Sequence, residues 1–413
     1  MGQIVSIWSG ILLRVFTLLN TTLGGKYMAG RNHLYVPGPT NVPQSILNAM
    51  NVAMEDHRSP IFPKLFKSLL IDLKKVFKTE TGKTFIFPGT GTAGWEVALT
   101  NTLNPMDRVL IYRFGHFSHL WATMGVRLGL EVEICDEPWG MGIPVKKLEA
   151  RLRADVHHSI KAVLATHNET STGVTSDIAG VRKAMNAAGH PALLYVDGVS
   201  SIASIDFRMD EWGVDGAISG SQKGFMMPAG GAFLAFSQKA LNMTATASLP
   251  RFFLDLTDQI TNNKDGYTPY TPSIPILYGL RQSLNLLFEE GLDNVFARHY
   301  RIAEGVRHAV AAWGMKVLSK EGFQSNTVTA VVVPEHKDAR DIIIEAFSKY
   351  NLSLGGGLSQ VSGKVFRIGH IGDMNEISIL GAIAGVELAM LGHGLSLRPG
   401  SGVGAAIDYF RST

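Results

Sequence analysis

Two short apolar segments each lead to a residue that could do chemistry. The first, Ala192–Asp197, ends in an acid; the second, Gly216–Ser219, is followed four residues later by Lys223. Asp197 and Lys223 are 26 residues apart (223 − 197), the distance of one connection between neighbouring strands. Ligands of open parallel sheets bind at the carboxyl ends of the strands. A lysine there can form a Schiff base, and a carboxylate can keep a pyridine nitrogen protonated, which is the pair that pyridoxal 5′-phosphate chemistry needs. Alone, Asp197 would more simply cap a turn and Lys223 would more simply be a surface lysine. Together, at the ends of neighbouring strands, the two residues favour a catalytic role.

A glycine-rich segment, Phe87–Glu96, supplies a second feature suited to a cofactor. It contains Thr90-Gly91-Thr92 and lies between an expected strand at Thr84–Phe87 and an expected helix at about residues 93–103. Backbone N–H groups at a helix N-terminus, with two hydroxyls beside them, can cradle a phosphate. The segment matches neither Gly-x-Gly-x-x-Gly nor the Walker A pattern, so by itself it could equally be a tight turn.

Two further polar features interrupt apolar sequence. The cluster Thr166–Gly173 offers Thr170 as a contact to the cofactor, whereas His167 is better interpreted as a loop histidine with satisfied hydrogen bonds. Arg367 lies inside the apolar run Val365–Ile368, where an unpaired guanidinium would be costly. Its buried partner is either a substrate α-carboxylate, bound bidentately, or an Asp or Glu of the chain.

The elements that position these residues follow from alternating strand and helix patterns. Between about residues 50 and 285 the alternation predicts a mainly parallel sheet with helices on both faces, an α/β fold. The expected strands are Thr84–Phe87, Arg108–Phe114, Glu131–Cys135, Ile160–Thr166, Ala192–Asp197, Gly216–Ser219 and Ala232–Phe236. Residues 286–413 predict a smaller C-terminal α+β domain. They follow an extended, proline-containing segment at 30–49 and an N-terminal extension at 1–29.

Composition narrows the class of protein. With 413 residues, 46% hydrophobic and 18% charged, the chain is expected to be a globular enzyme of two domains. A net charge of +3 without a Lys/Arg run argues against nucleic-acid binding. The single cysteine, Cys135, excludes an intrachain disulfide and a zinc site built on several cysteines, and no metal is expected.

The first 29 residues contain no Asp or Glu, and their apolar residues recur at helical spacing. Arg14 interrupts the run, so stable membrane insertion is not expected; with only Arg14 and Lys26 as basic residues before Met28, the segment is also a poor transit peptide. We expect residues 1–27 to lie outside the catalytic fold, most simply through a misassigned start codon and otherwise as a cleaved or lipid-anchored segment. A cytoplasmic enzyme is expected, with a peroxisome or mitochondrion as the alternative in a eukaryote.

Taken together, these motifs resemble the class-V, fold-type I pyridoxal-phosphate aminotransferases, and within them the serine–glyoxylate and alanine–glyoxylate branch. The resemblance runs from about Gly30 to Tyr409. The segments that carry it are Gly30–Asn41, Glu55–Pro60, His167–Val174, Asp197–Ser201, Gly220–Lys223, Pro269–Pro272 and Lys364–His370. It implies a large pyridoxal-phosphate domain followed by a small C-terminal domain.

For the cofactor, the resemblance implies that Lys223 is the Schiff-base lysine and proton shuttle and that Asp197 pairs with the pyridine nitrogen. Thr170 contacts the cofactor, and Phe117 falls where the family stacks an aromatic ring on the pyridine. The implied phosphate-binding residues are Thr90, Gly91, Thr92 and Gln222.

For substrate and assembly, the resemblance implies that Arg367 binds the carboxylate. Thr271 matches a phosphate contact made from the partner subunit, which implies a homodimer with shared sites; a tyrosine is expected near it, either Tyr267 or Tyr270. The implied reaction is a ping-pong transfer from L-serine to glyoxylate that yields hydroxypyruvate and glycine.

Three other functions are alternatives to transfer from serine to glyoxylate. Alanine as the amino donor uses the same chemistry. A pyridoxal-phosphate lyase or desulfurase is remote, because a desulfurase needs a mobile nucleophilic cysteine and Cys135 lies in an apolar strand. A non-catalytic regulator of the same fold would not need both Lys223 and Arg367.

Overall fold

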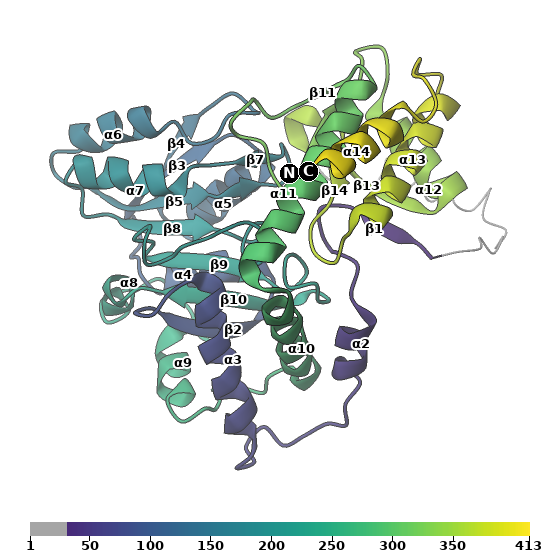
Figure 1. The fold of residues 1–413 in the computed structure, drawn as a ribbon. Helices are drawn as coiled ribbons and strands as arrows, with labels where there is room; N and C mark the ends of the chain where they lie inside the picture. The colour runs from purple at the N-terminus through teal and green to yellow at the C-terminus, as the bar shows by residue number, and fades with distance from the viewer. Residues whose placement is uncertain (1–30) are drawn as a thin grey trace, which may run out of the picture. The chain divides into compact units, whose positions relative to one another are not determined.

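The computed structural model describes residues 31–413 (Figure 1). Within them, His33–Thr413 form one compact unit. This unit holds a seven-stranded sheet, a five-stranded sheet and a small two-stranded sheet of β6 (Asn168–Glu169) and β7 (Val174–Thr175).

The seven-stranded sheet carries the strands that end in Asp197 and near Lys223. Its order is β2-β10-β9-β8-β5-β3-β4, and only β10 runs antiparallel to its neighbours. The strands are β2 (Lys83–Gly89), β3 (Arg108–Arg113), β4 (Glu131–Asp136), β5 (Ile160–Thr166), β8 (Leu193–Asp197), β9 (Gly216–Gly220) and β10 (Gly230–Phe236). The expected mainly parallel sheet is therefore confirmed.

Helices cover both faces of this sheet because its strands are apolar on both sides. In β3, for example, Leu110 packs into one core and its neighbours Val109 and Ile111 pack into the other. The helices of the first face are α3 (Phe62–Phe77), α6 (Val145–Ala154), α7 (Ile178–Ala187) and α10 (Ile274–Glu290). Those of the second are α4 (Gly91–Thr100), α5 (His116–Arg127), α8 (Gln238–Met243) and α9 (Leu256–Asn263).

The five-stranded sheet joins the two ends of the described chain. Its order is β1-β13-β14-β12-β11, and β1 pairs in parallel with β13 (Figure 1). The strands are β1 (His33–Tyr35), β11 (Lys316–Val317), β12 (Val328–Val332), β13 (Leu352–Gly356) and β14 (Val365–Gly369). The segment between β1 and the first large-sheet strand contains α2 (Gln44–Met50).

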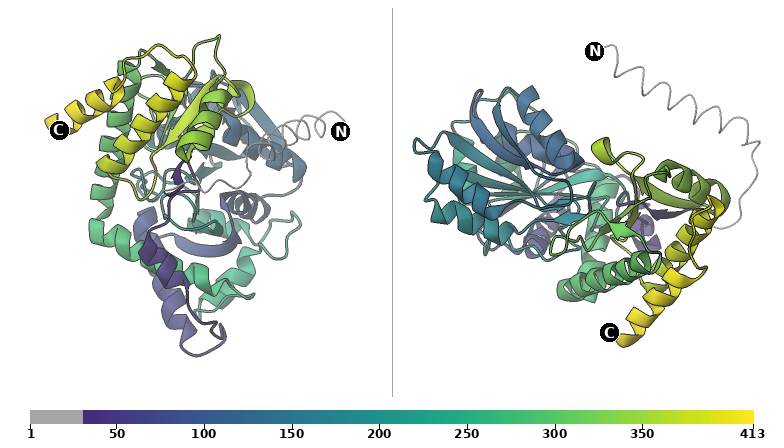
Figure 2. Two further views of the ribbon diagram at one scale, coloured as in Figure 1. Left: turned by 90° about the vertical axis from the view of Figure 1, so that its right-hand side faces the viewer. Right: turned by 90° about the horizontal axis from the view of Figure 1, so that it is seen from above.

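A separate core lies between this sheet and its helices. The helices are α11 (Leu292–Ala312), α12 (Ala339–Tyr350), α13 (Glu376–Gly392) and α14 (Ser401–Ser412), and a short 3₁₀ helix, η1, spans Ser359–Val361. Helices α11 and α14 lie side by side (Figure 2), where Arg301 donates a hydrogen bond to the Phe410 carbonyl. The expected domain boundaries stay predictions, since both sheets belong to one compact unit.

The expectations for residues 1–27 fall outside the described part of the chain and stay predictions, as does the cellular location. Across residues 31–413, no helix combines the length and apolar character that crossing a membrane requires.

Candidate active site

Asp197 and Lys223 lie at the same edge of the large sheet, as their spacing predicts. Strands β8 and β9 are parallel neighbours that pair Asp197 with Ile218, and Lys223 follows in the turn after β9. Both side chains are buried. Burial lowers the pKa of Lys223 to about 8, helped by the positive charge of Arg367, and burial raises the pKa of Asp197 to about 7.

A cavity of about 280 Å³ opens beside Lys223. It brings together four of the predicted site residues, Phe117, Thr170, Lys223 and Arg367. The rest of its wall comes from two segments, Val36–Pro39 after β1 and Leu354–Gly356 of β13. The cavity is thus bounded by the large sheet on one side and the five-stranded sheet on the other.

The segment after β1 closes tightly over Lys223. Lys223 Nζ donates a hydrogen bond to the Pro37 carbonyl. The next residue, Gly38, has a φ of +101°, and a Cβ there would lie 2.5 Å from the lysine Nζ. Only glycine fits this position, so the amine is covered by backbone rather than by side chains.

Arg367 lies across the cavity from this segment, in β14. Its Nε donates to the Gly356 carbonyl (2.8 Å) and its Nη1 to the Thr170 carbonyl (3.1 Å). Within residues 31–413 it forms no ion pair, and the buried Glu169 acts on it only through its charge, so the choice between a substrate carboxylate and an acid of the chain as its partner stays a prediction. Burial lowers the pKa of Arg367 to about 10, against the opposing effect of the Glu169 charge, and its remaining nitrogen, Nη2, has no hydrogen-bond partner among the described residues and can bind an anion.

The first turn of α4 has the open amides that an anion can bind. Thr90 precedes the helix, and the amides of Gly91 and Thr92 are among those that no intrahelical acceptor satisfies. A Cβ on Gly91 would lie 2.2 Å from a Val199 methyl, so glycine allows the helix to approach the end of β8. Gln222 Oε1 is buried without a hydrogen-bond partner in the described chain, close to Gly220 in front of this turn. With its amide group turned, Gln222 can donate to a phosphate here.

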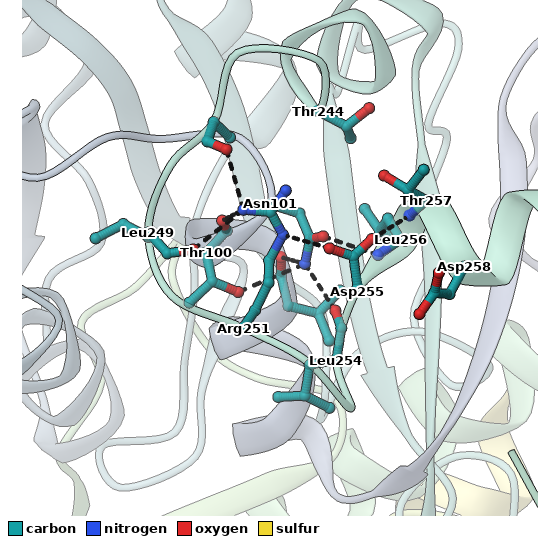
Figure 3. A network of polar contacts seen from close by, with 12 residues as sticks. Thr100, Asn101, Thr244, Leu249, Arg251, Leu254, Asp255, Leu256, Thr257 and Asp258 are labelled. Carbon is teal, nitrogen blue, oxygen red and sulfur yellow. Dashed lines mark hydrogen bonds and ion pairs between the residues drawn. The ribbon is translucent and has the colours of Figure 1, made fainter. Parts of the chain in front are cut away.

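The opposite end of α4 is fixed by a polar network (Figure 3). Asn101 Nδ2 donates to the carbonyls of Val97 and Leu254, both at 2.8 Å. Arg251 donates to the Thr100 carbonyl (3.0 Å) and pairs with Asp255 (3.0 Å). These contacts satisfy carbonyls that the helix C-terminus leaves open, and they hold the direction in which α4 presents its first turn.

Thr271 lies apart from the cavity, although it was predicted to contact the phosphate of a partner subunit. It is exposed before α10 and lines a different hollow together with Tyr270 and Pro88. The Tyr270 hydroxyl donates to Asp258, whereas Tyr267 stacks on Phe62 and lines neither hollow. The role of Thr271, and the choice between the two tyrosines, stay predictions.

His167 and Cys135 lie outside the cavity. His167 is buried, shares a hydrogen bond with Ser201 Oγ (2.8 Å) and packs edge-on against Trp212, which confirms a satisfied histidine. Cys135 is in β4, the outermost strand on its side of the sheet. A cysteine nucleophile is therefore not available to the cavity from the described chain.

Sequence reasoning missed two parts of the site. Glu169, in the polar cluster Thr166–Gly173, is a fully buried carboxylate at the start of α5. The signal that could have found it is an acid among the residues that follow a buried strand. The wall made by Pro37–Pro39 had no local signal, because its place depends on the pairing of β1 with β13.

Comparison with known proteins agrees with this geometry. The family model "Aminotransferase class-V" matches residues 33–359. The chain belongs to this family. Membership confirms the resemblance and identifies the chain as an aminotransferase of the fold-type I α/β architecture, and it implies pyridoxal phosphate as the cofactor.

Individual relatives cover nearly the whole chain. A serine–glyoxylate aminotransferase of Methylorubrum extorquens is 56% identical over 388 residues, 92% of this chain and 96% of the relative. An L-aspartate–glyoxylate aminotransferase of Paracoccus denitrificans is 51% identical over 388 residues, 94% and 98% of the two chains. A ureidoglycine–glyoxylate aminotransferase structure from Bacillus subtilis superposes with a TM-score of 0.86 at 25% identity, covering 94% of this chain and all of the other.

Proposed function

We propose that this aminotransferase transfers the amino group of L-serine to glyoxylate, with pyridoxal 5′-phosphate held at Lys223. The observation that carries the proposal is one cavity lined both by a buried lysine and by a buried arginine that forms no ion pair within the described chain. When bound, the cofactor supplies an aldehyde for the amino group and a ring that accepts electrons from the α-carbon.

The residues of the cavity fit that chemistry. Lys223 Nζ, with a pKa of about 8, can both hold and release a proton near neutral pH, as a proton shuttle must. Asp197 would hold the proton of the ring nitrogen; its pKa, raised to about 7 by burial, would fall beside a pyridinium. Phe117 and Thr170 line the same cavity as Lys223. Thr90, Gly91, Thr92 and Gln222 would hold the phosphate; for Gln222 the support is its buried Oε1, which has no partner in the described chain and would give place to the donor Nε2 if the amide were turned.

The charge of the cavity supports an amino donor with one carboxylate. Apart from Lys223, Arg367 is the one cationic side chain of the described chain that lines it. Arg367 can take the α-carboxylate, which serine, alanine and glyoxylate all offer. The second carboxylate of aspartate finds no further cation in this wall. The names of the serine–glyoxylate relatives favour serine over alanine.

Steady-state kinetics with glyoxylate and L-serine, L-alanine or L-aspartate test the proposal. We expect the highest kcat/KM with serine, and hydroxypyruvate and glycine in equal amounts. A higher kcat/KM with alanine or aspartate would overturn the choice of donor, and a chain that binds no pyridoxal phosphate would overturn the proposal as a whole.

We further propose a homodimer in which Thr271 serves the site of the partner. Its exposure and its position outside the cavity of its own chain support this role. Sedimentation equilibrium should give a dimer, and Thr271→Val should weaken binding of pyridoxal phosphate. A fully active monomer would contradict both statements.

A further inference from the structure

Glu169 is a buried carboxylate to which the proposed chemistry assigns no role. Its side chain is fully buried. Oε1 accepts hydrogen bonds from Phe117 N (3.2 Å), Ser171 N (3.1 Å) and Ser171 Oγ (2.6 Å). Oε2 accepts from Ser118 N (2.8 Å) and Ser118 Oγ (3.1 Å). All of these donors are neutral, and the buried Arg367 acts on Glu169 through its charge without forming an ion pair with it in the described chain.

The carboxylate replaces a missing cap at the start of α5. The N-cap residue is Gly115, which has no side chain to accept from the amides of the first turn. Glu169 accepts from two of those amides, and the positive end of the helix dipole favours its charge. A Cβ at residue 115 would lie 2.2 Å from Glu169 Cδ, so the glycine leaves room for the carboxylate.

Two residues beside the Glu169 carboxylate line the cavity. Phe117 is the second residue of α5, and Thr170 follows Glu169 in the chain; both face the cavity. The Thr170 carbonyl in turn binds Arg367. One carboxylate therefore links the aromatic side chain, the threonine and, through the threonine backbone, the arginine.

We propose that Glu169 is a positioning residue that fixes Phe117 and Thr170 relative to each other, so that they can hold the cofactor ring between them and Lys223. It touches neither cofactor nor substrate and acts through the start of α5. The inference rests on the proposed binding of pyridoxal phosphate.

A matched control exists elsewhere in the chain. Glu387 is also buried and also accepts from neutral donors at a helix start, Gly400 N and Gly402 N of α14, and from Trp313 Nε1. It belongs to the core of the five-stranded sheet and does not line the cavity. Glu387→Gln therefore makes the same chemical change without touching α5.

The test compares Glu169→Gln and Glu387→Gln by thermal unfolding of the cofactor-free proteins, by spectral titration with pyridoxal phosphate, and by visible circular dichroism of the bound cofactor. We expect both variants to lose stability. Only Glu169→Gln should bind the cofactor about tenfold more weakly and change its dichroism, which reports the orientation of the ring. Unchanged affinity and dichroism in Glu169→Gln would overturn the inference, as would an equal loss of affinity in both variants.

A double-mutant cycle separates positioning from general damage. If Glu169 acts through Phe117, the effects of Glu169→Gln and Phe117→Leu on cofactor affinity should not add; additive effects would overturn the inference. Ser118→Ala, which removes one hydroxyl from Glu169, gives the same comparison if Glu169→Gln does not fold. Wild-type protein that fails to bind pyridoxal phosphate would instead refute the proposed function.

Discussion

Replacement of Arg367 by methionine examines the substrate side of the cavity. Methionine keeps an unbranched side chain of similar reach and removes the charge and the donors. In the wild type, two donors are engaged by the carbonyls of Gly356 and Thr170, which leaves Nη2 for a carboxylate. One or two charge-assisted hydrogen bonds, at about 1.5–3 kcal/mol each, span about 1.5–6 kcal/mol, and we take the middle of that range, about 2–4 kcal/mol, as the expected loss. The KM should therefore rise by about 30- to 900-fold.

The measurement is the KM for both substrates, together with the absorption spectrum of bound cofactor and the unfolding temperature. Both KM values should rise, because serine and glyoxylate each present a carboxylate, while the cofactor stays bound. Some stability should be lost, because the carbonyls of Gly356 and Thr170 lose their donor. Arg182→Met is the control: this arginine is also largely buried and bonds Asp215 (2.9 Å), but it does not line the cavity.

The reasoning would be refuted if Arg367→Met left both KM values unchanged, or raised only one of them. An equal rise in Arg182→Met would show that the effect reports general destabilisation rather than carboxylate binding.

Three further predictions concern the cofactor side. Lys223→Ala should abolish turnover, and borohydride treatment of the wild type should fix the cofactor on a peptide that contains Lys223; modification of another peptide would remove it from the centre of the site. Uptake of pyridoxal phosphate by the cofactor-free protein should speed up as pH rises through about 8, because burial lowers the pKa of Lys223 and only the neutral amine attacks an aldehyde; a midpoint near the ordinary lysine value would contradict this. Asp197→Asn should keep the fold but slow single-turnover deprotonation, since an amide cannot hold a pyridinium; near-normal kinetics would show that another group protonates the ring.

The sequence predicted best those elements whose signals are local. Helices α6, α10 and α12 carry such signals within their own residues. Each shows apolar residues at helical spacing, and the last also begins after a capping aspartate, Asp338. Strand β5 was predicted at its observed bounds, because seven mostly apolar residues end in a polar cluster.

Elements stabilised by distant partners were missed. Strand β1 has three residues, and β13 is a five-residue segment that ends in two glycines, so neither carries a strand pattern of its own. They exist because they pair with each other. The same difference explains which parts of the site could be predicted. The adjacency of Asp197 and Lys223 followed from the spacing of neighbouring strands, whereas the cavity wall at Gly38 depends on strand pairing in the five-stranded sheet.

Glu169 and Thr271 show two other limits of local reasoning. A fully buried acid that forms no ion pair in the described chain contradicts the usual expectation for charged residues, and its five donors come from Phe117 and Ser118 on one segment and Ser171 on another. Thr271 is exposed in its own chain, so any role in catalysis depends on a second chain.

The pairing of β1 with β13 also bears on the order in which the protein takes shape during synthesis. His33 lies opposite Leu352, which follows it by 319 residues (352 − 33). The strands of the large sheet all emerge from the ribosome before β13 does, and domains generally fold as they emerge. Lys223 therefore acquires its cover from Pro37 and Gly38 only when the chain is nearly finished. Until then, Lys223 lies on a formed sheet without that cover, so burial depresses its pKa less and the amine is less ready to attack an aldehyde than in the finished protein.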